Sequence, residues 1–148
     1  NNNIEYGLLP INYLFSYKYY NKDAYVTYSL NISDSDISEI NDYSTTALAN
    51  NKEFDKQLMN AMEERLKLDN STLLKWLPYE IVKINDNRAI KISYYRYGIL
   101  SPIPVYVENY MIPYKKKMLT LTYSFQADRK NLLHDSFKES INSVKFDY

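Results

Sequence analysis

The chain carries a single histidine, His134, and the next residue is an acid, Asp135, so this pair is the first candidate for catalysis. The apolar residues Leu133, Phe137 and Ile141 recur at every fourth position around it, which predicts a helix. Neighbouring side chains on a helix project about 100° apart, so Asp135 would not face the imidazole ring. A catalytic dyad requires a carboxylate that orients the ring. We therefore interpret His134 as a residue at the border of a buried helical stripe and predict no catalytic role for it.

A cluster of acids is the next candidate, because its spacing resembles that of a calcium-binding loop. The cluster consists of Asp34, Asp36, Glu39 and Asp42. Calcium prefers carboxylate and carbonyl oxygens, but the EF-hand loop also needs a glycine at its sharp turn. That glycine is missing, and Ile37 stands where a ligand or a flexible residue is expected. We predict that these acids mark the start of a helical turn and that the chain has no metal site.

Other catalytic and phosphate-binding patterns are absent from the sequence. Cysteine does not occur, which excludes disulfides, thiol catalysis and thiolate metal sites. Gly7 and Gly98 are the only glycines, so a glycine-rich phosphate loop cannot form. A glycosidase needs two facing carboxylates, and no spacing nominates such a pair. We predict no cofactor, and an enzyme with an unrecognised carboxylate pair is the last of the functions kept open.

Tyrosine is unusually abundant, with 17 copies in the chain. The candidate ligand-binding residues are four of these tyrosines and one arginine: Tyr95, Tyr97, Tyr106, Tyr110 and Arg96. Alternation places Tyr95 with Tyr97 on one strand face, and Tyr106 with Tyr110 on one face of a nearby strand. Exposed together, these rings would form a platform for a sugar, a peptide or another protein. The alternative, which we favour, is that the rings pack under helices or across strands.

Length and charge restrict the class of protein. The chain has 148 residues, which is the size of one domain, and we expect residues 1–10 of it to be loosely held. It has 18 basic and 18 acidic side chains, so a nucleic-acid partner is not expected. No run approaches the roughly 18 apolar residues of a transmembrane helix. The first residues do not resemble a signal peptide, although an export signal or a lipid anchor ahead of Asn1 is compatible with the sequence.

The first half of the chain predicts a β-hairpin followed by a helix. Strict alternation from residue 24 to 32 indicates a half-buried strand, and residues 13–20 are its expected partner across a turn at 21–23. Residues 33–50 have roughly helical spacing. A clear amphipathic helix follows at 52–67. Its apolar stripe consists of Phe54, Leu58, Ala61, Met62 and Leu66.

The second half predicts two more hairpins and a closing helix. The expected strands are 79–84, 89–97, 105–112 and 118–125, with a turn at 85–88 and with Pro102 and Pro104 at an edge or in a loop. The residues Leu119, Leu121, Tyr123 and Phe125 make one side of the last strand apolar. Asp128 is expected to cap a helix that ends near Asn142. The buried stripe of that helix consists of Leu133, Phe137, Ile141 and Val144.

The order of these elements resembles that of the PsbP-like and Mog-like superfamily of α/β/α sandwich proteins. The ending "KMLTLTYSFQADRKNLLHDSFKESINSVKF" and the helix at 52–67 followed by "YEIVKINDNRAIKISYY" carry this resemblance. It implies an α+β fold in which an antiparallel sheet of about six strands is packed by two main amphipathic helices in three layers. It also implies a role in binding or assembly more than catalysis, although a fold does not fix a function.

These observations lead to a ranked expectation about function. The first is a non-enzymatic binding or assembly module that holds a protein partner or a small ligand. The second is an exported bacterial protein that binds a small molecule or a carbohydrate through a tyrosine-rich sheet face. The abundance of Asn, Lys, Ile and Tyr is typical of an AT-rich bacterial genome, and the lack of cysteine is compatible with export. We therefore expect the protein in the periplasm, on the cell surface or in the medium.

Overall fold

The structure, a computed structural model, describes most of the chain from residue 51 onward and three strands before it. The described residues are 3–5, 13–21, 24–33, 51–98, 102–114 and 117–143. The helical turn expected at 33–50 lies outside them apart from Ser33, and so does the stretch from Val144 onward.

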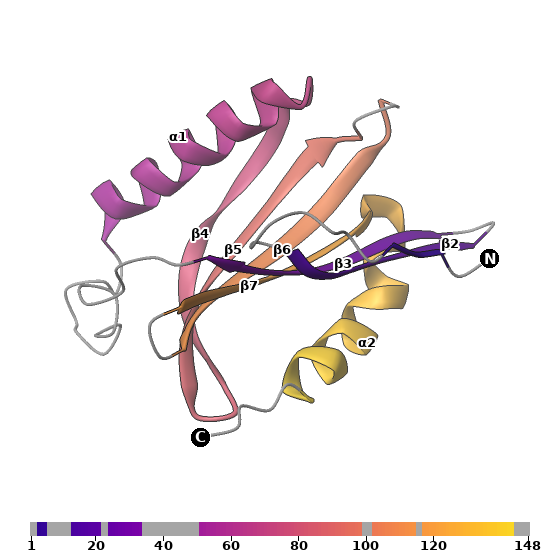
Figure 1. The fold of residues 1–148 in the computed structure, drawn as a ribbon. Helices are drawn as coiled ribbons and strands as arrows, with labels where there is room; N and C mark the ends of the chain where they lie inside the picture. Colours follow the sequence, from indigo (N-terminus) through magenta and orange to yellow (C-terminus); the bar gives the residue numbers. More distant parts are fainter. Residues whose placement is uncertain are drawn as a thin grey trace.

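The described strands form one antiparallel sheet in the order β1-β2-β3-β7-β6-β5-β4 (Figure 1). The strands are β1 (Asn3–Glu5), β2 (Tyr13–Asn21), β3 (Ala24–Ser33), β4 (Leu73–Ile84), β5 (Asn87–Tyr97), β6 (Pro104–Tyr114) and β7 (Lys117–Gln126). The α+β class and the antiparallel sheet are therefore confirmed. β1 is a strand that the sequence does not predict, and it pairs with β2 inside the segment expected to be loosely held.

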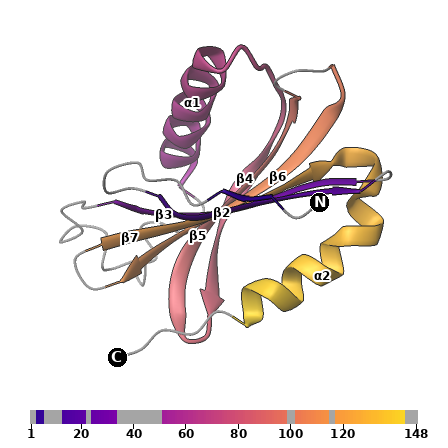
Figure 2. The same cartoon turned by 45° about the vertical axis from the view of Figure 1, so that its right-hand side comes forward.

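Two helices flank this sheet. α1 (Lys52–Leu68) lies on one side of the sheet, and α2 (Lys130–Asn142) lies on the other, as both views show (Figures 1 and 2). Asn51 caps the start of α1: its side-chain Oδ1 accepts a hydrogen bond from Phe54 N at 3.0 Å, the usual way to satisfy a free amide at a helix start. α2 does not begin at a capping Asp128, because a 3-10 turn, Ala127–Arg129, precedes it and Asp128 is exposed within that turn.

Each helix covers a separate hydrophobic core. The core beneath α1 contains the buried residues Leu66, Tyr79, Ile90, Ile92, Tyr94, Val105 and Val107. The core beneath α2 contains the buried residues Ile84, Ala89, Tyr106, Tyr110, Ile112, Tyr123, Phe125 and Ile141. Phe54, Leu58 and Met62 pack against the first core as predicted, but Ala61 is exposed. The side chains of Leu133 and Phe137 lie outside what the structure describes.

The edge strand β4 is longer than predicted, because it begins at Leu73 and not at Tyr79. Register shifts interrupt its pairing with β5 near Leu74 and near Pro78, and such bulges change which side chains face the core. An edge strand tolerates a proline because one side of it needs no ladder hydrogen bond. The turn to β5 uses positive φ angles of 44° at Asn85 and 69° at Asp86, which these residue types adopt readily.

Candidate functional site

Glu108 on β6 is the only buried charged side chain among the described residues, with 2% of its surface exposed. Alternation along β6 places it on the same face as Tyr106 and Tyr110, toward α2 and in the middle of the sheet. A carboxylate that leaves water must be paired or hydrogen-bonded to remain charged there. Its partners therefore define the candidate site.

Four side chains surround the Glu108 carboxylate. Tyr106 donates its hydroxyl proton to Oε1 at 2.7 Å, and Tyr110 donates to Oε2 at 2.7 Å. His134 Nε2 lies 3.0 Å from Oε1, and Lys91 Nζ lies 3.7 Å from the same oxygen. These residues come from β5, β6 and α2, so the cluster joins α2 to the centre of the sheet. We call these five residues the Glu108 cluster.

The position of His134 corrects the sequence interpretation in part. Asp135 is exposed, in keeping with the prediction that it does not form a dyad with its neighbour. However, His134 does contact a carboxylate, and that carboxylate is Glu108, which is 26 residues away in the chain. Its ring also lies 6.4 Å from that of Tyr106, edge to face. A signal was available, because the alternation in "YVENY" places Glu108 between two tyrosines on one strand face.

The cluster moves the pKa values of Glu108, Tyr106 and Tyr110 away from neutral pH. Burial alone would raise the pKa of Glu108, but the hydrogen bonds from Tyr106 and Tyr110, the charge of Lys91 and the contact with His134 outweigh it and lower that pKa. Burial is also the largest cause that raises the pKa of Tyr106 and of Tyr110, and the nearby carboxylate raises both further. Glu108 therefore remains ionised and both tyrosines remain protonated over the neutral range.

Lys130, in the first turn of α2, extends the cluster toward the solvent. Its Nζ donates to the Tyr95 hydroxyl at 3.2 Å and lies 4.3 Å from the centre of the Tyr106 ring. The Tyr95 and Tyr106 rings are 5.0 Å apart. A cation over a tyrosine face adds roughly 0.5–1 kcal/mol at an exposed site and more when it is desolvated. These contacts fix the start of α2 against β5 and β6.

The predicted ligand-binding residues fall into two groups. Tyr106 and Tyr110 are 2% and 6% exposed, so they pack beneath α2, and Tyr95 is half-buried beside them. Tyr97 is 39% exposed at the end of β5. Arg96 is half-buried next to it and donates from Nη1 to the Tyr97 carbonyl at 2.9 Å. The five residues do not form one exposed platform.

Large exposed hydrophobic side chains gather at one end of the sheet. Among the described residues they are Leu68, Leu74, Tyr97 and Ile103, which are 82%, 41%, 39% and 44% exposed. They come from the end of α1, the start of β4, the end of β5 and the segment before β6. The register of β4, β5 and β6 brings these ends together. We call these four residues the apolar end.

Hydrogen bonds hold the apolar end in place. Tyr97 N donates to the Thr72 carbonyl at 3.1 Å, and Gly98 N donates to the Ile103 carbonyl at 2.9 Å. The buried Ser71 donates from Oγ to the Tyr97 carbonyl at 2.8 Å and from its backbone N to the Leu66 carbonyl at 2.8 Å. The backbone that carries these exposed side chains is therefore held in place by hydrogen bonds.

The described side chains include no group of three or more His, Cys, Asp or Glu residues placed to hold a metal ion. The acids predicted as a helix start, Asp34 to Asp42, lie outside the described residues. No described helix is both long enough and apolar enough to cross a membrane.

Comparison with known proteins identifies the fold and no more than the fold. No protein-family model matches the chain, and no curated protein matches it either. Among solved structures, it is similar to PA94 of Pseudomonas aeruginosa, a protein of unknown function described as a candidate regulator, with 14% identity, a TM-score of 0.57 and coverage of 100% of this chain and 84% of that one. It is also similar to CyanoP, the cyanobacterial PsbP of Synechocystis, with 12% identity, a TM-score of 0.58 and coverage of 100% and 81%. The chain thus has a PsbP-like fold.

Proposed function

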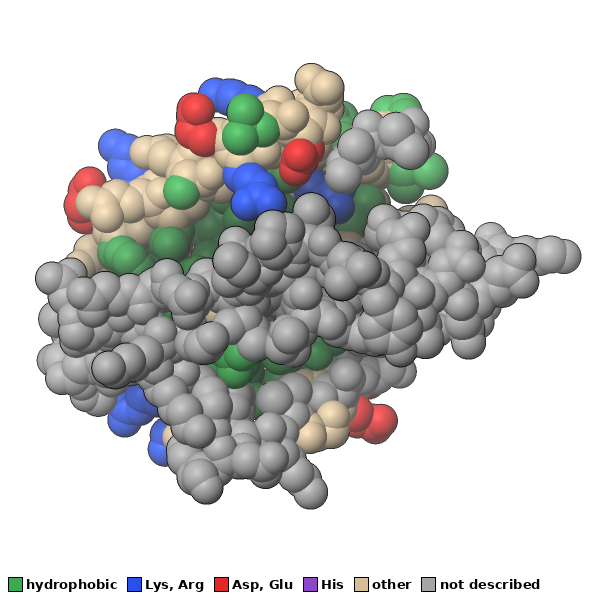
Figure 3. Space-filling view, in the orientation of Figure 1, with side chains coloured by type: hydrophobic (Ala, Val, Ile, Leu, Met, Phe, Trp, Pro, Cys, Tyr) green, Lys and Arg blue, Asp and Glu red, His purple; other side chains and the backbone are tan. Residues whose placement is uncertain are grey.

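We propose that this protein is a non-enzymatic binding or assembly module, built as a PsbP-like three-layer sandwich, that docks a protein partner at its apolar end. The observation that carries this proposal is the gathering of Leu68, Leu74, Tyr97 and Ile103 at one end of the sheet. Figure 3 shows hydrophobic side chains, in green, at the upper right of the molecule, where β6 begins in Figure 1. A single exposed apolar residue needs no explanation, whereas a larger exposed apolar patch marks an interaction site. These four residues share one end of the sheet.

Burial of the exposed side chains of the apolar end would supply enough free energy for binding. Burying one exposed aliphatic side chain contributes roughly 1.5–3 kcal/mol, and a few such anchors dominate typical interfaces. Leu68 and Ile103 are aliphatic, and Tyr97 belongs to a residue type enriched at interface hot spots. Because their backbone is tied by hydrogen bonds, little ordering of the backbone would oppose binding.

The Glu108 cluster supports a structural role over a catalytic one. A general acid or base works best with a pKa near the working pH. Here the pKa of Glu108 is lowered and those of Tyr106 and Tyr110 are raised. Each of these pKa values is therefore moved farther from neutral pH, which does not suit a general acid or base. Both oxygens of the carboxylate already accept hydrogen bonds. The cluster fixes α2 on the sheet.

Site-specific photo-crosslinking tests the proposal. A photoreactive phenylalanine analogue would replace Ile103 or Tyr97 in the cells that produce the protein, and crosslinked products would be identified by mass spectrometry. We expect one defined protein to be captured from both positions. The matched control carries the same analogue at Glu139, an exposed position on α2, and should not capture that protein.

A binding measurement with the captured protein completes the test. Leu68→Ser together with Ile103→Ser should raise the Kd by about tenfold or more, while Gln57→Ser together with Lys138→Ser, both at exposed positions, should leave it unchanged. Equal capture from positions 103 and 139, or an unchanged Kd in the Leu68 and Ile103 variant, would refute the proposal.

A second candidate function is the binding of a small molecule or a carbohydrate by an exported bacterial protein. The observation that favours it is the exposed Tyr97 ring, since an exposed planar ring can stack on a sugar or an aromatic ligand. Arg96 is its neighbour in the chain and donates from Nη1 to the Tyr97 carbonyl at 2.9 Å. Tyr95 and the buried Tyr106 and Tyr110 would then have a supporting role in the site and would not contact the ligand themselves. A thermal-shift screen with sugars and nucleotides tests it: a ligand should raise the Tm of the wild type and not of Tyr97→Ala.

A further inference from the structure

The charged residues next to the apolar end in the chain have an excess of positive charge. The charged residues adjacent to its members in the chain, or one helical turn away, are Glu64, Arg65, Lys67, Asp69, Lys75 and Arg96. Lys67 Nζ lies 3.4 Å from Glu64 Oε1, so those two charges offset each other. Three basic side chains, Arg65, Lys75 and Arg96, then stand against one acid, Asp69. The whole chain, by contrast, has a formal net charge of zero.

Three of these side chains lie near one another, around the ring of Tyr94. Arg65, Arg96 and Asp69 all act electrostatically on the same buried ring, that of Tyr94. Arg96 is held in place by its hydrogen bond to the Tyr97 carbonyl at 2.9 Å. Lys75 follows Leu74 directly on the edge strand and is exposed, as is Arg65. The apolar end therefore has next to it one positive side chain held by a hydrogen bond, Arg96, and two exposed ones, Arg65 and Lys75.

We propose that the apolar end recognises a protein segment in which an apolar centre is flanked by acidic side chains. This inference rests on the proposed function and names the chemistry of its partner. Complementary charge at the rim of an interface speeds association and rejects partners of the wrong sign. A second copy of this chain does not fit, because two basic rims would face each other. The apolar residues supply the anchoring contact, and Arg65, Lys75 and Arg96 select acidic flanks.

Short fluorescent peptides test the inference directly. All peptides carry the same Leu-Phe-Ile centre, and their flanks are either Asp and Glu, Ser, or Lys. Fluorescence anisotropy with the full chain should give a Kd for the acidic peptide about tenfold below that for the Ser peptide, and the weakest binding for the Lys peptide. The preference should shrink as salt is raised, because exposed charges are screened.

Paired charge reversals supply the matched control. Arg65→Glu with Lys75→Glu should abolish the preference for acidic flanks. Lys56→Glu with Lys83→Glu introduces the same change in charge on the same two elements, also at exposed positions, and should retain the preference. Circular dichroism would verify that both variants are folded.

Three outcomes of the peptide measurements would overturn the inference. They are equal binding of all peptides or of none, a preference for basic flanks, and a loss of preference in both double variants alike. Binding to phosphatidylglycerol vesicles but not to the acidic peptide would also overturn it, in favour of an anionic membrane surface. If the inference fails while crosslinking from position 103 still captures a defined protein, the proposed function stands and only the chemistry of the partner is wrong.

Discussion

At the scale of single residues, the buried carboxylate of Glu108 is the shared acceptor that holds its neighbouring side chains together. Glu108→Ala would leave the hydroxyls of Tyr106 and Tyr110 and the ammonium of Lys91 without their shared acceptor. Removing one partner of a buried, hydrogen-bonded charge costs roughly 3–5 kcal/mol. We expect the free energy of unfolding, measured in urea, to fall by about that amount.

Glu80 provides the control for this substitution, because its Oε2 lies 3.4 Å from the same Lys91 Nζ while its side chain is 62% exposed. Exposed ion pairs contribute about 0–1 kcal/mol, so Glu80→Ala should have little effect. Similar losses for both variants would mean that the Glu108 cluster does not stabilise the fold.

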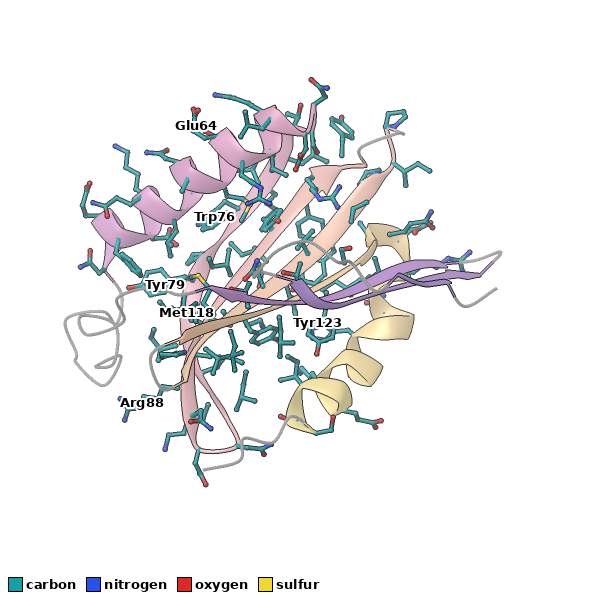
Figure 4. The ribbon with its side chains drawn as sticks, in the orientation of Figure 1. Glu64, Trp76, Tyr79, Arg88, Met118 and Tyr123 are labelled. Carbon is teal, nitrogen blue, oxygen red and sulfur yellow. The ribbon has the colours of Figure 1, made fainter. Side chains whose placement is uncertain are left out.

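At the scale of elements, a single aspartate ties α1 to the edge strand. Asp55 Oδ1 accepts hydrogen bonds from Trp76 Nε1 at 3.0 Å and from Tyr79 N at 2.9 Å, and Figure 4 shows Trp76 and Tyr79 on β4 near α1. Asp55→Ala would remove the acceptor of two partly buried donors, the Trp76 indole N–H and the Tyr79 amide, which costs about 1–3 kcal/mol. Hydrogen exchange should become faster in α1 and β4 and remain unchanged in α2. The control is Glu53→Ala, since Glu53 is also an acid of the first turn but is exposed.

The sequence predicted those elements in which apolar residues repeat with one regular spacing throughout. Alternation located β3 and β7, and the spacing of Phe54, Leu58, Met62 and Leu66 located α1. The start of β4 was missed because register shifts near Leu74 and Pro78 break the alternation of two. The contact of His134 with Glu108 was missed for a different reason. It depends on how α2 lies across the sheet, and local spacing carries no information about that placement.

At the scale of the whole molecule, acid should unfold the protein through Glu108. The pKa of Glu108 is lowered in the folded protein from an ordinary value of 4.5, as the hydrogen bonds and Lys91 outweigh burial. A lowered folded pKa means that the stabilisation is present above pH 4.5 and is lost as pH falls below it toward the folded value. Urea titrations across that range should show a loss of stability in the wild type. Glu108→Gln, which cannot titrate, should show a smaller loss, and an equal slope in both proteins would contradict the assignment.

High pH should also weaken the Glu108 cluster, through ionisation of its two tyrosines. Burial, followed by the carboxylate of Glu108, raises the pKa of Tyr106 and of Tyr110 above the ordinary value of 10.0. The folded protein then keeps protons that the unfolded chain releases, so the stabilisation is complete below pH 10 and is lost as pH rises beyond it. Tyrosinate absorbance should show the exposed tyrosines ionising first, with the last rings ionising together with the loss of circular dichroism. Tyr106→Phe with Tyr110→Phe should remove that final, cooperative portion of the absorbance change. Ionisation of every ring in a still-folded protein would contradict the buried placement of these two tyrosines, and with it the attachment of α2 to the sheet through the Glu108 cluster.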